Sequence, residues 1–292
     1  CVAILLGGQV ISGSCDKTLK VWDLTKEPGQ ECIATLTGHI NLIRCIAILS
    51  DGRVISGACD GIKVWDLSRR PGQECVAALG DRNDWGRSVT ILPDERVITG
   101  ATDGSLKLWD LTRLAGHECV ATLEGPSTLI RCVVVHPDGR VISNSGDNTL
   151  KIWDLNKEAP ANMCIAILSG HNDSIRCVVV HPDGRVISAS DDKTLKVWDL
   201  DQKQGQECIA TLEGLSKDVC QVSIHPDGRV VSVSDNGILK IWDLTRASGD
   251  MCVATLKGRG SWWVRCMVST PEGWVISNSY DKTLQVCNPY GS

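Results

Sequence analysis

A Trp-Asp dipeptide recurs along the chain at nearly constant spacing. It stands at Trp22-Asp23, Trp65-Asp66, Trp109-Asp110, Trp153-Asp154, Trp198-Asp199 and Trp242-Asp243, 43 to 45 residues apart, and Cys287-Asn288 holds a seventh equivalent position. A fixed period of this length is typical of repeat architectures, in which each repeat is one supersecondary unit and neighbouring units bury a shared core. The spacing therefore predicts seven repeats.

Each repeat contains four short runs rich in β-branched residues, separated by turn residues. The stretch from Cys177 to Gly214 shows the pattern, with CVVVHPDGRVISAS followed by DDKTLKVWDL and later by ECIATLEG. The recurring Pro-Asp-Gly-Arg, as at 137–140, places Pro and Gly where a tight hairpin needs them. The pattern predicts four antiparallel strands per repeat and an all-β chain.

These residues resemble the WD-repeat β-propeller family over essentially the whole chain. The family pattern has Gly-His before the innermost strand, Ser-x-Ser in the second strand, Asp in the next turn and Trp-Asp at the end of the third. The resemblance implies a seven-bladed β-propeller of four-stranded antiparallel blades, formed as a single domain over residues 1–292. The third strands are expected to end near residues 23, 66, 110, 154, 199, 243 and 288.

The two ends of the chain do not complete this pattern. Cys1 aligns with Cys45 and Cys132, so the chain begins in an innermost strand, and only residues 288–292 follow Cys287. We therefore expect the last blade to lack its outer strand in this chain. The resemblance implies that an N-terminal segment of a longer protein supplies that strand, and an unpaired edge would be a site of pairing or aggregation.

Charge and hydropathy exclude several classes of function. The net charge of -5 and the isoelectric point near 5.7, with no basic block, disfavour a dedicated nucleic-acid-binding protein. No apolar run approaches the roughly 18 residues that a membrane span needs, and the first residues lack the basic flank of a secretory signal. We expect a cytoplasmic or otherwise intracellular protein with no membrane or nucleic-acid partner.

The 15 cysteines fall at positions fixed by the repeat. One set lies in innermost strands (Cys1, Cys45, Cys132, Cys177, Cys266) and another opens outermost strands (Cys32, Cys75, Cys119, Cys164, Cys208, Cys252). Within a blade these strands are three spacings of about 4.8 Å apart, beyond the roughly 7 Å limit for a disulfide. No Cys-x-x-Cys pair indicates zinc, and we interpret the thiols as reduced, small buried hydrophobes.

Two repeats bring Ser, His and Asp together in a way that suggests a hydrolase. In the family the same residues resemble a structural tetrad, a buried chain of hydrogen bonds that the Trp indole completes. A nucleophile would instead need exposure and an oxyanion site. We therefore expect two structural tetrads, no catalytic residue and no cofactor. The tetrads are His39, Ser56, Asp60 and Trp65, and His171, Ser188, Asp192 and Trp198.

Three histidines that precede Pro-Asp-Gly, namely His136, His181 and His225, suggest a metal ring on the lower rim. They stand on separate blades, whose spacing keeps their side chains from converging on one ion. We therefore expect no metal site.

An arginine recurs at the start of the innermost strand in five repeats: Arg44, Arg87, Arg131, Arg176 and Arg265. In a propeller this position faces the upper mouth of the channel, where guanidinium groups bind carboxylate or phosphate in a bidentate manner. Some F-box WD-repeat propellers read phosphorylated peptides with arginines at similar positions. Trp85 and Trp262 stand close by in sequence and complete the candidate contact set. Alternatively, these arginines recur through repeat duplication and pair with loop acids such as Asp84 or Asp173.

The sequence thus predicts a monomeric scaffold that binds a protein or peptide partner, such as one with an acidic or phosphorylated segment, on its upper face. The alternative is a sensor or autoinhibitory domain of a larger signalling ATPase or kinase. An enzyme is disfavoured because no acid pair, nucleophile or metal set stands out from the repeat.

Overall fold

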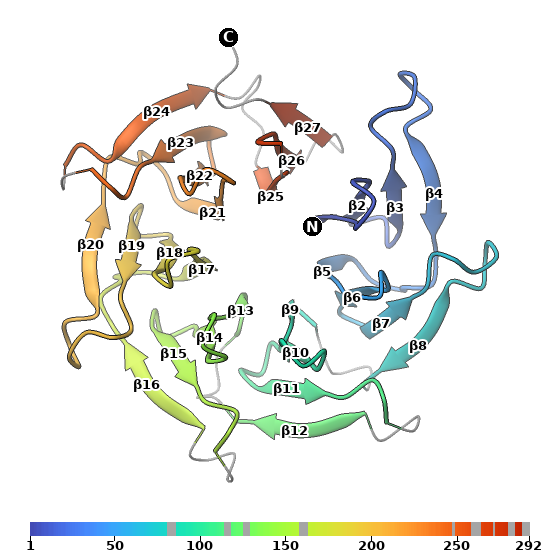
Figure 1. Ribbon diagram of the computed structural model, residues 1–292, viewed down its shortest axis with the longest axis horizontal. Coiled ribbons are helices and arrows are strands. Elements are labelled where there is room, and N and C mark those ends of the chain that lie inside the picture. The colour runs from blue at the N-terminus through green and yellow to red at the C-terminus, as the bar shows by residue number, and fades with distance from the viewer. Residues whose placement is uncertain are drawn as a thin grey trace. The chain divides into compact units, whose positions relative to one another are not determined.

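The chain folds into short antiparallel strands (Figure 1). The computed structural model describes residues 1–80, 86–113, 118–124, 129–157, 163–246, 249–257, 264–270, 272–279 and 284–287. It contains two compact units, one formed by Cys1–Val135 and Asn156–Met163, the other by His136–Leu155 and Cys164–Ser292. Among the described residues, none belongs to a helix with the length and hydropathy to cross a bilayer.

The first unit consists of three four-stranded sheets and one further strand. The sheets are β1 (Val2–Ile4), β2 (Val10–Gly13), β3 (Leu19–Trp22) and β4 (Cys32–Leu36); β5 (Ile43–Ile48), β6 (Val54–Ala58), β7 (Gly61–Trp65) and β8 (Cys75–Leu79); and β9 (Ser88–Ile91), β10 (Val97–Gly100), β11 (Leu106–Trp109) and β12 (Cys119–Leu123). The further strand is β13 (Val133–Val135). First strands of consecutive sheets are neighbours, with β5 next to both β1 and β9.

The second unit continues the same order. Its strands are β14 (Val141–Asn144), β15 (Leu150–Trp153) and β16 (Cys164–Leu168); β17 (Ile175–Val180), β18 (Val186–Ser190), β19 (Leu195–Trp198) and β20 (Cys208–Leu212); β21 (Val219–Ile224), β22 (Val230–Ser234), β23 (Ile238–Trp242) and β24 (Cys252–Lys257); and β25 (Val264–Ser269), β26 (Val275–Ser279) and β27 (Leu284–Cys287). Here too the first strands β17, β21 and β25 are consecutive neighbours.

The expected seven-bladed propeller of four-stranded blades is wrong. Six sheets have four strands, but the last is a partial sheet of three, in the order β25-β26-β27. Each complete sheet ends in a strand such as β24, which pairs with the third strand. No fourth strand pairs with β27 among the described residues, which form six four-stranded sheets and one three-stranded sheet.

Apolar residues of neighbouring sheets form shared cores. Trp65 of β7, which is 1% exposed, belongs to one cluster with Ile11 and Leu19 of the preceding sheet. Second strands such as β6 and β18 are buried along their whole length, because sheets cover them on both faces. This packing fixes the strand ends, and with them the loops and turns that carry polar side chains.

The cysteines are partly as expected. Every cysteine whose side chain is described is a free thiol. Cys45 and Cys177 of first strands are buried, but Cys32, Cys75 and Cys208 at the start of outer strands are exposed. The interpretation as buried hydrophobes is therefore wrong for these residues, because the outer strands are exposed where they begin and buried only at their last residue.

A hydrogen bond joins the Trp of each third strand to a hydroxyl of the second strand in all six complete sheets. The indole Nε1 of Trp22 donates to Ser12 Oγ over 2.7 Å, and that of Trp109 donates to Thr99 Oγ1 over 2.9 Å. Equivalent bonds of 2.8 to 2.9 Å link Trp65 to Ser56, Trp153 to Ser143, Trp198 to Ser188 and Trp242 to Ser232.

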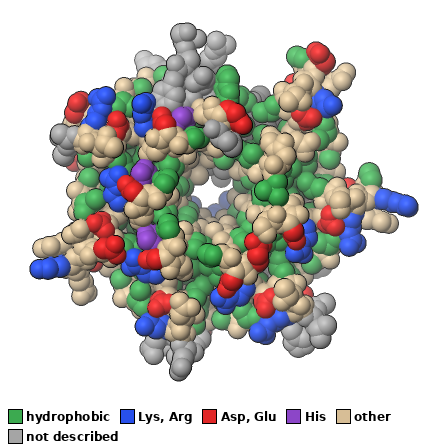
Figure 2. Space-filling view, viewed as in Figure 1, with side chains coloured by type: hydrophobic (Ala, Val, Ile, Leu, Met, Phe, Trp, Pro, Cys, Tyr) green, Lys and Arg blue, Asp and Glu red, His purple; other side chains and the backbone are tan. Residues whose placement is uncertain are grey.

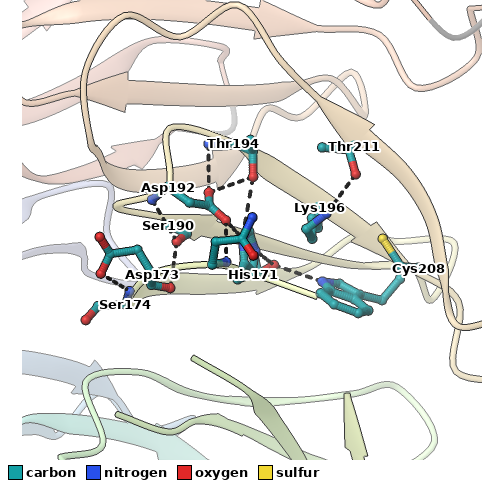
Figure 3. Close-up of polar contacts among 12 residues, drawn as sticks. His171, Asp173, Ser174, Ser190, Asp192, Thr194, Lys196, Cys208 and Thr211 are labelled. Atoms are coloured by element: carbon teal, nitrogen blue, oxygen red, sulfur yellow. Dashed lines mark hydrogen bonds and ion pairs between the residues drawn. The ribbon is translucent and has the colours of Figure 1, made fainter. Parts of the chain in front are cut away.

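In two sheets a histidine and an aspartate extend this bond into a buried chain (Figure 3). His171 Nε2 lies 2.7 Å from Ser188 Oγ, and its Nδ1 lies 2.6 Å from Asp192 Oδ2. Since Ser188 also accepts from Trp198, four residues from two strands, one loop and one turn form a continuous network. The networks at His171 and at His39 have the same composition.

The network around His39 has the same geometry. Its Nε2 is 2.7 Å from Ser56 Oγ and its Nδ1 is 2.9 Å from Asp60 Oδ1. Elsewhere the His position is filled differently; Leu215, for example, is 7% exposed in the β21–β24 sheet. An apolar side chain there leaves the Trp242–Ser232 bond without the His–Asp extension.

Burial lowers the pKa of both tetrad histidines, and the hydrogen bond and charge of the partner aspartate offset this only in part. Burial alone would raise the pKa of Asp192, but hydrogen bonds from Thr194 and His171 lower it overall. The native network therefore contains a neutral imidazole beside an ionised carboxylate.

We expect Ser188→Ala to reduce the free energy of unfolding by about 2–4 kcal/mol, because it deprives both His171 and Trp198 of a partner. Ser232→Ala, which removes a hydroxyl bonded to the indole of Trp242, should cost about 1–2 kcal/mol. Urea unfolding of both variants measures the difference. Equal losses would show that the histidine adds nothing to the network.

The stabilising effect of His171 should decline in acid. Its pKa is lower in the folded chain than the ordinary 6.5, so the unfolded chain binds the extra proton more readily. Stability from the neutral ring is present above pH 6.5 and is lost as pH falls toward the folded pKa, by at most about 1.4 kcal/mol per pH unit. The difference in unfolding free energy between parent and His171→Asn should therefore shrink from pH 7.5 to pH 5.5. A constant difference would contradict this.

Candidate partner-binding site

The recurrent arginine position lies at a bulge in the first strand. Pairing between β5 and β6 shifts register between Ile43 and Cys45, so that Arg44 is the additional residue. The same shift places Arg176 at the bulge of β17. A bulge interrupts the regular alternation of side chains and redirects the additional one, which explains why a long charged residue is tolerated between two buried neighbours.

In the second unit Arg176 is neutralised by acids. Its Nε donates to Asp191 Oδ1 over 2.5 Å, and the side chains are 33% and 15% exposed. Burial would lower the pKa of Arg176, but the hydrogen bond and charge of Asp191 and the charge of Asp235 raise it. Arg176 is therefore held in an internal ion pair rather than presented to a ligand.

The next sheet has a thiol at the arginine position. Cys220 is the bulge residue of β21 and donates its thiol proton to Asp235 Oδ1. Burial and the adjacent carboxylate raise the pKa of Cys220, so the thiol stays protonated. Asp235 follows β22 as Asp191 follows β18, and the two acids occupy equivalent turn positions.

In the first unit Arg44 has a different environment. Its Nε is buried without a hydrogen-bond partner in the part of the chain that the structure describes. The turn position that holds Asp191 in the other sheet is occupied here by Cys59, a half-buried free thiol. The acid beside it, Asp60, accepts from the N–H of Ile40 and contacts His39. Arg44 therefore combines a desolvated guanidinium nitrogen with an opposing turn that offers no free carboxylate.

The remaining candidates are only partly described. Arg87 and Arg131 are half-buried, and the backbone N–H of Arg87 donates to Gly100 O over 3.1 Å. The side chain of Arg265, together with Trp85 and Trp262, lies outside the described residues. Asp84, one proposed partner of the arginines, is also outside them.

The turn position that faces the bulge was missed by sequence reasoning. It varies from repeat to repeat, with Cys15, Cys59, Thr102, Gly146, Asp191 and Asp235 in the first six. The signal was present in the alignment of the repeats, because this residue directly precedes the recurrent turn Asp or Asn. It distinguishes Arg176, which pairs with Asp191, from Arg44, in whose sheet Cys59 holds the equivalent position.

No group of His, Cys, Asp and Glu side chains among the described residues is arranged to hold a metal ion. The lower-rim histidines instead contact backbone carbonyls and aspartates.

Comparison with known proteins agrees with the repeat structure. The family model described as "WD domain, G-beta repeat" matches residues 1–23, 30–66, 84–110, 117–154, 162–199 and 206–243. These matches cover more than half of the chain and end at the six Trp-Asp dipeptides.

A curated relative matches over a short segment. The F-box/WD repeat-containing protein sel-10 of Caenorhabditis elegans is 54% identical over 33 residues, which are 11% of this chain and 6% of that protein. This match is shorter than one repeat, and it shows only that this segment is similar. The six family matches, by contrast, coincide with the sheets and their Trp–hydroxyl bonds, and the chain therefore belongs to the WD-repeat family of β-propeller proteins.

Proposed function

We propose that this chain is a protein-interaction scaffold that holds an anionic group of a peptide or protein partner at Arg44. WD-repeat propellers are generally non-catalytic interaction scaffolds. The observation that carries the proposal is the buried Nε of Arg44, which has no acceptor among the described residues. A buried donor without a partner is costly, and a ligand carboxylate or phosphate would satisfy it with a charge-assisted bond.

The contrast with Arg176 supports this choice. The two arginines occupy equivalent bulges, but Arg176 donates to Asp191, whereas Cys59 holds the position equivalent to Asp191 in the sheet of Arg44. An arginine already paired with a carboxylate must lose that partner before it can bind another. Arg44 is therefore the stronger anion site, and Arg176 serves as its matched control.

An exposed apolar side chain, that of Ile40, belongs to a residue four positions before Arg44 in the sequence. Ile40 is 63% exposed in the loop that leads into β5, and its N–H is fixed by Asp60. Apolar contact beside an arginine is typical of residues that dominate interfaces. We infer a partner segment with an acidic or phosphorylated residue and an apolar neighbour.

Binding of acidic and phosphorylated peptides from an immobilised library tests the proposal. Arg44→Gln should weaken the best binder by about 10-fold to 100-fold, as expected for loss of one charge-assisted bond. Arg176→Gln, at the equivalent bulge, should change affinity by less than threefold. Equal affinity of the parent and Arg44→Gln, or an equal loss in both variants, would contradict the assignment.

The ion pair with Asp191 should limit the binding of an anionic ligand to Arg176. Asp191→Asn removes the carboxylate that pairs with Arg176 and should increase affinity for an acidic peptide by up to about fivefold, the range of a partly exposed ion pair. The gain should disappear in the double variant Asp191→Asn/Arg176→Gln. An unchanged affinity in Asp191→Asn would show that Asp191 does not block Arg176.

A further inference from the structure

The hairpin turn after each first strand has one position whose side chain differs between the two units. At this position the backbone N–H donates to the carbonyl four residues later. The first unit has leucine there, and the second unit has histidine in three consecutive repeats. The residues are Leu5, Leu49 and Leu92, and His136, His181 and His225. Leu49 and Leu92 are buried at 1% and 4% exposure.

Each histidine reaches the hairpin turn of the following repeat. The Nε2 of His136 lies 2.7 Å from Gly184 O, and the Nε2 of His181 lies 2.7 Å from Gly228 O. His225 makes the third contact, 3.0 Å from Gly273 O. A carbonyl oxygen can only accept, so Nε2 must carry a proton and donate it. Each bond thereby links two consecutive repeats within the second unit.

The acceptor turns have glycine at a position with positive φ, and at Gly273 a side chain would also be crowded by the histidine. Gly184 and Gly228 have φ values of 90° and 85°, in the left-handed region that disfavours side chains. A Cβ at Gly184 would lie 3.4 Å from Nε2 of His136, and one at Gly273 would lie 3.0 Å from Nε2 of His225. Gly139 has a similar φ of 89°, but a Cβ there would meet nothing within 4 Å. The close approach belongs to the turns that a histidine contacts.

The other ring nitrogen faces a carboxylate in all three repeats. The distance from Nδ1 to Oδ1 is 2.7 Å for His136 and Asp138, and 2.6 Å for His181 and Asp183. It is 2.7 Å for His225 and Asp227. An ionised carboxylate only accepts, so Nδ1 must also carry a proton for this contact to be favourable. Only the imidazolium satisfies both contacts.

The turn also offers an arrangement for the neutral ring. The backbone N–H of Asp183 lies 3.3 Å from Nδ1 of His181, and that of Asp138 lies 3.4 Å from Nδ1 of His136. After Nδ1 loses its proton it can accept from this N–H, but the contact with the carboxylate becomes repulsive. Loss of the Nδ1 proton therefore replaces the contact with the carboxylate by a hydrogen bond from the backbone N–H of the same turn.

The surrounding charges keep the aspartates ionised. Arg140, Arg185 and Arg229 pair with the aspartates of their own turns. Although burial opposes ionisation, hydrogen bonds from Arg185 and His181 lower the pKa of Asp183 to about 2. The other facing charges are Asp201 at Arg140, Asp199 at Arg185, Asp243 at Arg229, and Glu272 next to Gly273. Figure 2 shows histidines on one face of the molecule, flanked by acidic and basic side chains.

We propose that His136, His181 and His225 form a proton-dependent latch between consecutive repeats of the second unit, which tightens as pH falls from 8 to 6. Imidazole ordinarily gains its second proton within this range. The leucines at the equivalent turns of the first unit cannot respond. The sign is opposite to that of the tetrad histidines, whose buried rings are stabilising when neutral.

The test compares the thermal unfolding of the parent chain with that of His181→Leu, the residue that Leu49 provides in the first unit. At pH 6 the variant should melt about 2–4 °C below the parent, as expected for loss of one such bond. At pH 8 the deficit should fall to less than half of that value. Titration of the tetrad histidines cancels in this difference. A deficit that is equal at both pH values, or larger at pH 8, would overturn the proposal.

The Asp183→Asn background and imidazole ¹⁵N spectra test the role of the carboxylate and the protonation of the rings separately. In Asp183→Asn the effect of His181→Leu should become independent of pH, and a persistent increase at pH 6 would overturn the role of the carboxylate. Imidazole ¹⁵N spectra of the unmodified chain test the latch without any substitution. The three rings should carry protons on both nitrogens at pH 6 and on Nε2 alone at pH 8. A neutral ring protonated at Nδ1 would overturn the proposal.

Discussion

The hydrogen bond between the indole of each third strand and a hydroxyl of the second strand is the interaction on which every complete sheet depends. In five of these sheets it spans adjacent strands in the buried interior, where neither group can be satisfied by water, and in the β1–β4 sheet Trp22 and Ser12 are half-buried. Trp is large enough to fill the space between sheets and carries one donor that must be satisfied. The partial sheet has Cys287 at this position, a residue with no indole.

The complete sheets share this Trp–hydroxyl bond, but they differ in the residues near it and at the bulge of the first strand. His171 and His39 extend the bond to a carboxylate, whereas Leu215 fills the same place with an apolar side chain. At the bulge, Arg176 is paired with Asp191 while the turn opposite Arg44 has Cys59. The Trp–hydroxyl network and the proposed anion site therefore occupy different positions, so one can vary with little effect on the other.

Much of the local structure could be predicted from the sequence, for physical reasons. The Trp-Asp period and the Pro-Asp-Gly turns indicated the strand order, because alternating apolar residues and tight turns leave few other arrangements. The seven-bladed propeller of four-stranded blades was wrong, because the last sheet has three strands, although the missing outer strand of that sheet was expected. Exposure of Cys32 and Cys208 was missed because sequence does not show that one face of an outer strand is uncovered.

Whether Arg44 or Arg176 has an internal counterion could not be settled from the sequence either. It depends on the residue that faces the bulge, which is 15 positions away in the case of Arg176 and Asp191. The contact of His181 with Gly228 O involves a backbone acceptor 47 positions away and leaves no residue signature except the exchange of Leu for His. Long-range contacts of this kind require coordinates.

Hydrogen exchange of the indole N–H groups tests whether the Trp–hydroxyl bonds hold the complete sheets together. Trp65, Trp198, Trp153 and Trp242 are equally buried, at 1 to 2% exposure, but only the first two have hydroxyl partners that also contact a histidine. We expect the indole N–H groups of all four residues to exchange slowly, and those of Trp65 and Trp198 most slowly. Exchange of any of these indoles as fast as that of a solvent-exposed tryptophan would contradict it.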